Sequence, residues 1–69
     1  MSLGEFYSVS YFCNVEVAVE RKDGALEEFA LVSAGELNKE ALRRHEEALV
    51  REVFPTERGI GLTVFHPSE

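Results

Sequence analysis

Residues 6–21 of the chain read FYSVSYFCNVEVAVER, and this stretch contains the longest regular pattern in the sequence. Its successive odd positions are apolar: Tyr7, Val9, Tyr11, Cys13, Val15, Val17 and Val19. Because neighbouring side chains of a β-strand point to opposite faces, this alternation predicts one long strand with a buried face. Such a strand would be roughly 50 Å long at about 3.3 Å per residue. We therefore expect either a bend near Cys13 and Asn14 or a projecting end.

The residues that follow predict a β-hairpin. Lys22-Asp23-Gly24 is typical of a turn, because glycine supplies the positive φ that tight hairpins need. The second strand is predicted from Leu26 to Val32. A two-residue loop would place Phe29 on the opposite face from the valines of the first strand. We therefore predict a three-residue loop, a type I turn with a G1 bulge at Gly24.

A helix is expected next, with two candidate starts. Ser33 and Glu36 have the spacing of a capping box, and Asn38 is the second candidate cap. The central apolar positions of the helix are Leu42, Leu49 and Val53. Pro55 ends the predicted helix at Phe54, because proline lacks the backbone donor that a helix needs.

A third strand is predicted from Ile60 to Phe65, and it completes the expected fold. The fold class is α+β, a three-stranded antiparallel sheet with one helix packed on one face. The first strand lies in the centre, between the second and the third. Residues 1–69 form a single small domain, because a chain of 69 residues is too short for two.

Composition and charge narrow the classes of function. The chain has 13 acidic and 7 basic residues, a net charge of −6, and it is 45 % hydrophobic. Nucleic-acid binders need many Lys and Arg residues to neutralise phosphates, so we expect no direct contact with nucleic acid. No apolar run is long enough to span a membrane, and no signal peptide is visible, so we expect a cytoplasmic protein.

No residue pattern predicts an enzyme. Cys13 is the single cysteine, which excludes an internal disulfide, and no activating cation accompanies a contact between Cys13 and His45. We interpret His45 as a boundary histidine that is hydrogen-bonded to a neighbour. With Glu46 or Glu52 it forms no recognised set of metal ligands. We therefore predict no catalytic residue, no metal site and no cofactor.

The aromatic residues carry the stronger functional prediction. Phe6, Phe12 and Phe65 are expected to line a sheet face away from the helix, with acidic residues around them. The projecting end of the first strand would add further aromatic side chains. The predicted interface residues are Phe6, Tyr7, Tyr11, Phe12, Phe65, Glu16, Glu20 and Glu28.

Three functions follow as hypotheses. The first is a small acidic protein-binding module without enzymatic activity, either a homodimer or an inhibitor that docks on a basic partner. In size, acidity and missing catalytic groups the chain is similar to phage-encoded inhibitors of host defence, such as anti-CRISPR proteins. The alternative is a small-molecule-binding or enzymatic homo-oligomer, with a pocket at the subunit interface around His45 and Tyr11. The third is a structural subunit of a larger assembly.

Overall fold

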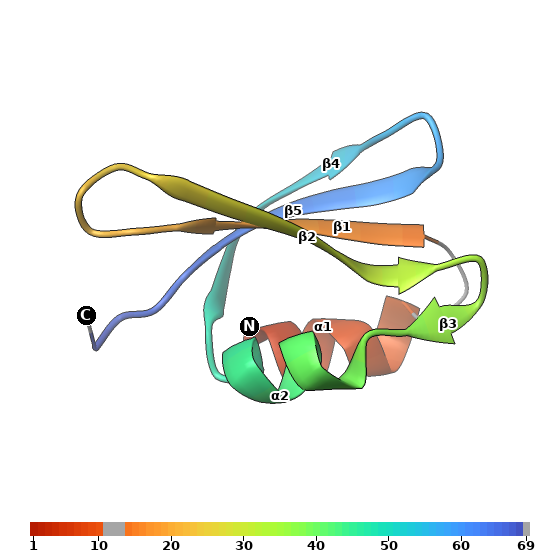
Figure 1. The fold of residues 1–69 in the computed structure, drawn as a ribbon, viewed down its shortest axis with the longest axis horizontal. Coiled ribbons are helices and arrows are strands. Elements are labelled where there is room, and N and C mark those ends of the chain that lie inside the picture. The colour runs from red at the N-terminus through yellow and green to blue at the C-terminus, as the bar shows by residue number, and fades with distance from the viewer. Residues whose placement is uncertain (11–13, 69) are drawn as a thin grey trace.

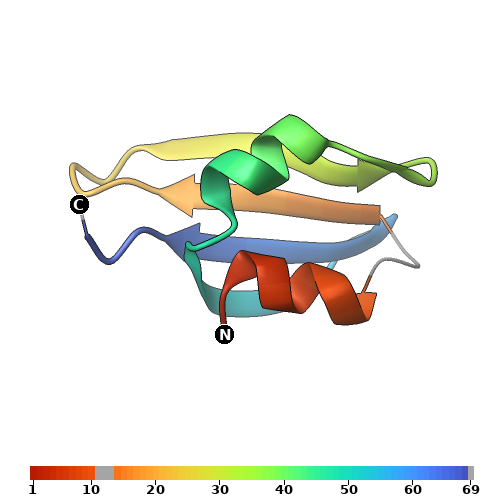
Figure 2. The ribbon, with the colours of Figure 1, turned by 90° about the horizontal axis from the view of Figure 1, so that it is seen from below.

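The computed structural model describes residues 1–10 and 14–68 and shows a five-stranded mixed sheet with both helices on one side (Figure 1, Figure 2). Along the chain the elements are α1 (Leu3–Ser10), β1 (Asn14–Glu20), β2 (Leu26–Ser33), β3 (Glu36–Leu37), α2 (Lys39–His45), β4 (Leu49–Pro55) and β5 (Gly59–Phe65). The strand order across the sheet is β3-β2-β1-β5-β4. The central strands β1 and β5 are parallel, and the other neighbours are antiparallel.

The predicted three-stranded antiparallel sheet with one helix is therefore wrong. The third predicted strand does lie beside the first, as β5, but the two strands run in the same direction. An additional strand, β4, precedes β5 and forms an antiparallel hairpin with it. That extra reversal of the chain turns β5 parallel to β1.

The first half of the predicted long strand is also wrong, because Leu3–Ser10 forms the helix α1. A capping box begins this helix: the Glu5 backbone N–H donates to the Ser2 hydroxyl at 3.2 Å, and the Ser2 N–H donates to the Glu5 carboxylate at 3.1 Å. Leu3 and Phe6, three residues apart, are buried in the core, and Tyr7 packs against it. Helical spacing thus explains these apolar residues better than alternation does.

The β1–β2 hairpin confirms the predicted loop. Val17 lies opposite Phe29, so Phe29 shares the face of the valines. The N–H of Arg21 donates to the carbonyl of Ala25 at 2.8 Å, which leaves a three-residue loop between them. Gly24 donates to the Arg21 carbonyl at 3.0 Å and has a φ of 89°, as a type I turn with a G1 bulge requires.

Of the two candidate starts of the second helix, Asn38 is confirmed. Its side chain accepts a hydrogen bond from the Ala41 N–H at 3.1 Å, at the first turn of α2. Ser33 instead pairs with Glu36 across a tight turn between β2 and β3. That turn is possible because its two central residues have positive φ values, 53° at Ala34 and 81° at Gly35.

The predicted helix end at Phe54 is wrong, because α2 ends at His45 and the residues from Leu49 form β4. The apolar residues of β4 come in two doublets four residues apart, Leu49-Val50 and Val53-Phe54, which resembles helical spacing. A β-bulge produces this pattern: the register shifts between Val50 and Glu52. The shift lets both Val50 and Val53 pair with buried residues of β5, which strict alternation would not allow.

The core lies between the helices and the covered side of the sheet. Its largest fully buried side chains are Leu3, Leu31, Leu62, Val15, Val17, Val19 and Val64. Backbone bonds anchor α1 in place: the Leu3 N–H donates to the Ala48 carbonyl at 2.8 Å, and Gly4 donates to the Glu46 carbonyl at 3.0 Å. No helix in the described part of the chain is long and apolar enough to cross a membrane.

Candidate functional site

The side of the sheet opposite the helices forms the candidate site, and we call this surface the open face. Paired residues on neighbouring strands share a face, so the strand register defines its members. Its residues include Glu16, Ala18, Glu20, Leu26, Glu28, Ala30, Leu49, Glu52, Phe54, Gly61, Thr63 and Phe65. Neither α1 nor α2 covers this surface (Figure 1, Figure 2).

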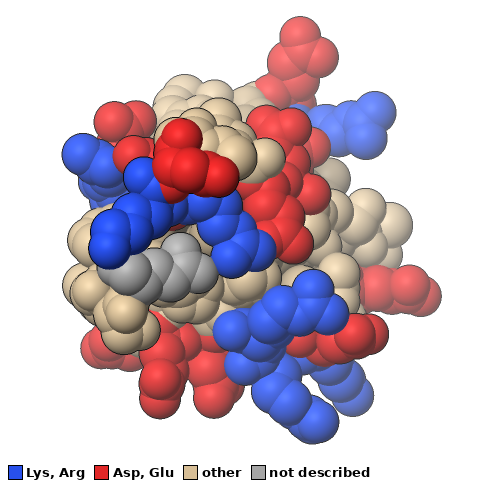
Figure 3. Space-filling model, turned by 60° about the vertical axis from the view of Figure 1, so that its left-hand side comes forward, with Lys and Arg blue, Asp and Glu red and all other residues tan. Residues whose placement is uncertain are grey.

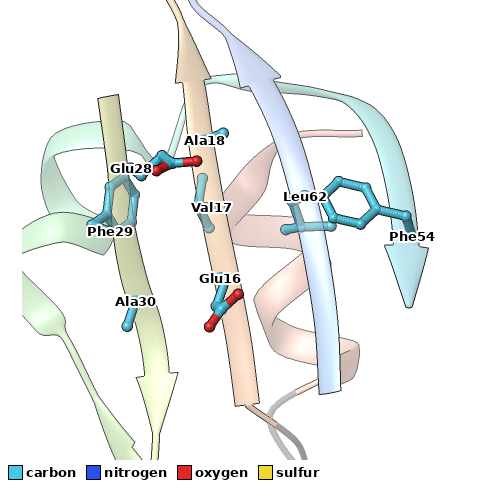
Figure 4. Close-up of a pocket in the computed structure, with 8 residues that line it drawn as sticks. All are labelled: Glu16, Val17, Ala18, Glu28, Phe29, Ala30, Phe54 and Leu62. Carbon is cyan, nitrogen blue, oxygen red and sulfur yellow. The ribbon is translucent and has the colours of Figure 1, made fainter. Parts of the chain in front are cut away.

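A groove of about 360 Å³ crosses the open face. Ala18 and Ala30 line its centre, and their short side chains leave the space that a larger residue would fill. Glu16, Glu28 and Phe54 surround it; Phe54 reaches from β4 across β5, and the Glu28 carboxylate extends from β2 toward β1 (Figure 4). The groove therefore combines an apolar floor with two acidic groups and one aromatic ring.

The position of Phe54 depends on a glycine. A Cβ atom at residue 61 would overlap three ring atoms of Phe54, so only glycine leaves room for the ring on β5. The ring covers the backbone of Gly61, its cross-strand partner, yet Phe54 remains 42 % exposed. Gly61 is also the β5 neighbour of Glu16, so Phe54 and Glu16 line the same groove from two sides of this glycine.

The carboxylates of the groove differ from others nearby in lacking a cation. Among the described residues, arginine partners are seen for Glu20 with Arg51, Glu27 with Arg21 and Glu40 with Arg44. The hydrogen bond from Arg21 lowers the pKa of Glu27. At the end of the molecule formed by the β1–β2 turn, basic and acidic side chains lie beside one another (Figure 3). Within the described residues, Glu16 and Glu28 form no ion pair.

Glu16 also borders a hollow that is lined by a cation, Arg58. A smaller adjoining hollow is lined by Glu16, Thr56, Glu57 and Arg58. Arg58 forms no ion pair with Glu16 in the described structure, and its backbone N–H donates to the Thr56 hydroxyl at 3.3 Å. The Glu16 carboxylate thus remains available on the groove side.

A second polar cluster lies under the sheet, at the end of α2. His45 is buried, its ring stacks on Phe29 at 5.2 Å, and its Nδ1 lies 2.8 Å from Nε2 of His66. Burial, and next the charge of His66, lower the pKa of His45. The predicted hydrogen bond of His45 to a neighbour is confirmed, but its position at the boundary of the core is wrong, because the residue is buried.

The burial of His45 and its bond to His66 limit what this residue could contribute to the alternative pocket around His45 and Tyr11. His45 is 3 % exposed, and one of its ring nitrogens is already engaged by His66. Tyr11 and Cys13 lie outside the described residues, and so does any contact between Cys13 and His45, which the sequence left open. Among the described side chains, no group of three or more His, Cys, Asp or Glu residues could hold a metal ion.

The structure separates the predicted interface residues into two groups. Phe65, Glu16, Glu20 and Glu28 lie together on the open face. Phe6 does not line that face, because it is buried in α1 on the other side of the sheet, where Tyr7 also packs. Tyr11 and Phe12 lie outside the described residues.

Sequence reasoning missed Phe54, because the bulge in β4 hides the strand pattern that would have placed it. The available signal was Gly61, because a glycine inside a strand marks either a bulge or a site of close approach. The structure shows that an aromatic ring, rather than another backbone, makes that approach.

Comparison with known proteins gives no relative on which to base a function. No protein-family model matches the chain, and no curated protein or solved structure matches it. Support for a function therefore comes from the chain's own geometry and charge.

Proposed function

We propose that the chain is a small non-enzymatic module that docks its open face on a basic segment of another protein. One observation carries the proposal: two carboxylates, Glu16 and Glu28, border an exposed groove with apolar residues at its base. Neither carboxylate forms an ion pair in the described structure. Covering these carboxylates without pairing them would be costly, since a buried charge needs a partner. A lysine or arginine side chain of the partner would supply the missing cation.

The sign of the charge favours a foreign partner over a second copy. The open face carries the glutamates Glu16, Glu20, Glu28 and Glu52, and among the described residues only Glu20 of these pairs with an arginine, Arg51. Two such faces in contact would place like charges together, which disfavours association. The expected dimer also relied on Phe6 and Tyr7, which the chain's own core uses.

An inhibitor that covers a basic surface of another protein is the form of this module that best fits its size and acidity. Electrostatic attraction between the net charge of −6 and a basic partner would speed their encounter. A cytoplasmic location is part of the proposal.

A titration with a basic peptide tests the proposal. The probe is a blocked peptide of four Gly-Lys repeats, and its affinity is measured by calorimetry at about 50 mM and about 300 mM salt. The Glu16→Gln/Glu28→Gln variant removes the two carboxylates of the groove. Its matched control, Glu46→Gln/Glu47→Gln, removes the same charge from the exposed turn after α2.

We expect the groove variant to bind the peptide about 3-fold to 10-fold more weakly, since each exposed ion pair contributes up to about 1 kcal/mol. The control variant should change the affinity by less than about twofold, because distant exposed charges are screened. Affinity for both proteins should fall at the higher salt concentration. Equal losses in the two variants would show that net charge alone attracts the peptide, and the open face would then not be a docking site.

A further inference from the structure

The geometry of the groove points to arginine, rather than lysine, as the side chain that anchors the partner, an inference that rests on the proposed function. Four residues of the open face form a square on β1 and β2. Glu16 lies opposite Ala30, and Ala18 lies opposite Glu28. The two carboxylates therefore occupy one diagonal of the square, and the two alanines occupy the other.

The diagonal arrangement suits a group with donors on several edges. Diagonal neighbours of this kind lie about 7–8 Å apart, with their Cβ atoms somewhat closer. A guanidinium is planar and presents five N–H donors in a fixed fork, so it can donate to one carboxylate from each side. An ammonium is a compact point charge that cannot bridge two separated acceptors as well.

Phe54 supplies the second feature that favours arginine. Its ring covers Gly61, the strand neighbour of Glu16, and is 42 % exposed toward solvent. Guanidinium groups stack on aromatic rings more often than ammonium groups do. A guanidinium that donates to Glu16 would lie within reach of this ring, and its methylene stem would cover the two alanines.

No arginine of the described chain occupies this position. Arg51 is held on Glu20 by two hydrogen bonds of 2.9 and 3.0 Å. Arg58 lies across the adjoining hollow without bonding to Glu16. The partner's arginine would complete an arrangement that is already built on rigid strands.

A comparison of two peptides of equal charge tests the inference. Blocked peptides of four Gly-Arg repeats and four Gly-Lys repeats are titrated against the unmodified protein and against Phe54→Leu and Phe54→Tyr. Leucine keeps apolar bulk over Gly61 but removes the aromatic plane, whereas tyrosine keeps that plane. Circular dichroism and the urea midpoint verify that each variant is folded.

We expect the arginine peptide to bind the unmodified protein about 3-fold to 10-fold more tightly than the lysine peptide. Phe54→Leu should reduce this ratio to less than about twofold, and Phe54→Tyr should retain it. Equal affinities of the two peptides, or a ratio that Phe54→Leu leaves unchanged, would overturn the inference. The proposed function would survive that result if Glu16→Gln/Glu28→Gln still weakens both peptides, and it would fail if that variant weakens neither.

Discussion

The two faces of the sheet have opposite chemistry, although the same strands build both. On β1 the valines at positions 15, 17 and 19 are at most 2 % exposed, whereas Glu16 between them is exposed. The covered face consists mainly of aliphatic side chains, with Phe29 beside the valines, and it packs against α1 and α2. The open face combines alanine, glycine, glutamate and single aromatic residues. The difference indicates that the covered face provides most of the stability of the domain. The open face is therefore available for the proposed docking of a partner.

The largest expected effect contrasts two neighbours on β5. Leu62 is fully buried on the covered face, and Thr63 lies on the open face. Leu62→Ala should lower the free energy of unfolding by about 2–5 kcal/mol, because it removes buried atoms and leaves a cavity. Thr63→Ala should lower it by less than about 1 kcal/mol. Urea unfolding measures both, and similar losses would contradict the assignment of stability to one face.

A smaller effect is expected from the aromatic contact on the open face. Gly61→Ala should lower the free energy of unfolding by about 1–3 kcal/mol, because the new Cβ overlaps the ring of Phe54. In a Phe54→Ala background the same substitution should be neutral or stabilising, since alanine suits a strand better than glycine. A double-mutant cycle by urea unfolding measures this coupling. Additive effects would show that the ring does not rest on Gly61.

The capping box of α1 is expected to stabilise the helix that packs on the covered face. Ser2→Ala should lower the free energy of unfolding by about 1 kcal/mol, because the Glu5 N–H loses its acceptor. Ser33→Ala is the matched control, since Ser33 has the same spacing to a glutamate but lies in a strand. It should cost less than about 0.5 kcal/mol. Equal costs in thermal unfolding would contradict the different roles of the two serines.

A pH effect is expected from His45, which packs under the covered face. Its folded pKa lies below the ordinary value of 6.5, mainly because the ring is buried. As the pH falls through 6.5, the unfolded chain takes up a proton that the folded chain does not. The free energy of unfolding should therefore be highest above about pH 7 and should decrease as the pH falls toward the folded pKa of His45. Below that pKa the effect of His45 stays constant. Urea midpoints at about pH 7.5 and about pH 5.5 measure it, and a higher midpoint at the lower pH would contradict it.

The sequence predicted some elements well because their signals are local. The hairpin loop follows from the glycine at residue 24 and from the register that keeps Phe29 with the valines. The start of α2 follows from Asn38, one of two candidate caps. Each of these depends on a few adjacent residues, so no distant contact was needed to recognise it.

Other elements depended on context that a pattern alone does not supply. Serine and glutamate at capping-box spacing begin a helix at Ser2 but flank a tight turn at Ser33. The difference lies in the intervening residues and in the environment: β3 pairs with β2 at Ser33, whereas α1 docks on the carbonyls after α2. The capping signal at Ser2 was missed from the sequence.

The candidate site could be predicted in part. Alternation along β1 and β2 placed Glu16, Glu20 and Glu28 on a face away from the core, and Phe65 followed from β5. The groove itself could not be predicted, because it requires Phe54 on β4, and the bulge disguised that strand as a helix. The parallel pairing of β1 with β5, which brings Gly61 beside Glu16, depends on the same strand.

The most direct test of docking on the open face uses the methyl signals of four alanines. Ala18 and Ala30 lie in the groove of the open face, and Ala41 and Ala48 are buried on the covered side. Methyl NMR spectra are recorded during a titration with the peptide of four Gly-Arg repeats. We expect the methyl signals of Ala18 and Ala30 to shift with peptide concentration, while the chemical shifts of Ala41 and Ala48 remain unchanged. Shifts confined to Ala41 and Ala48, or equal shifts of all four, would contradict it.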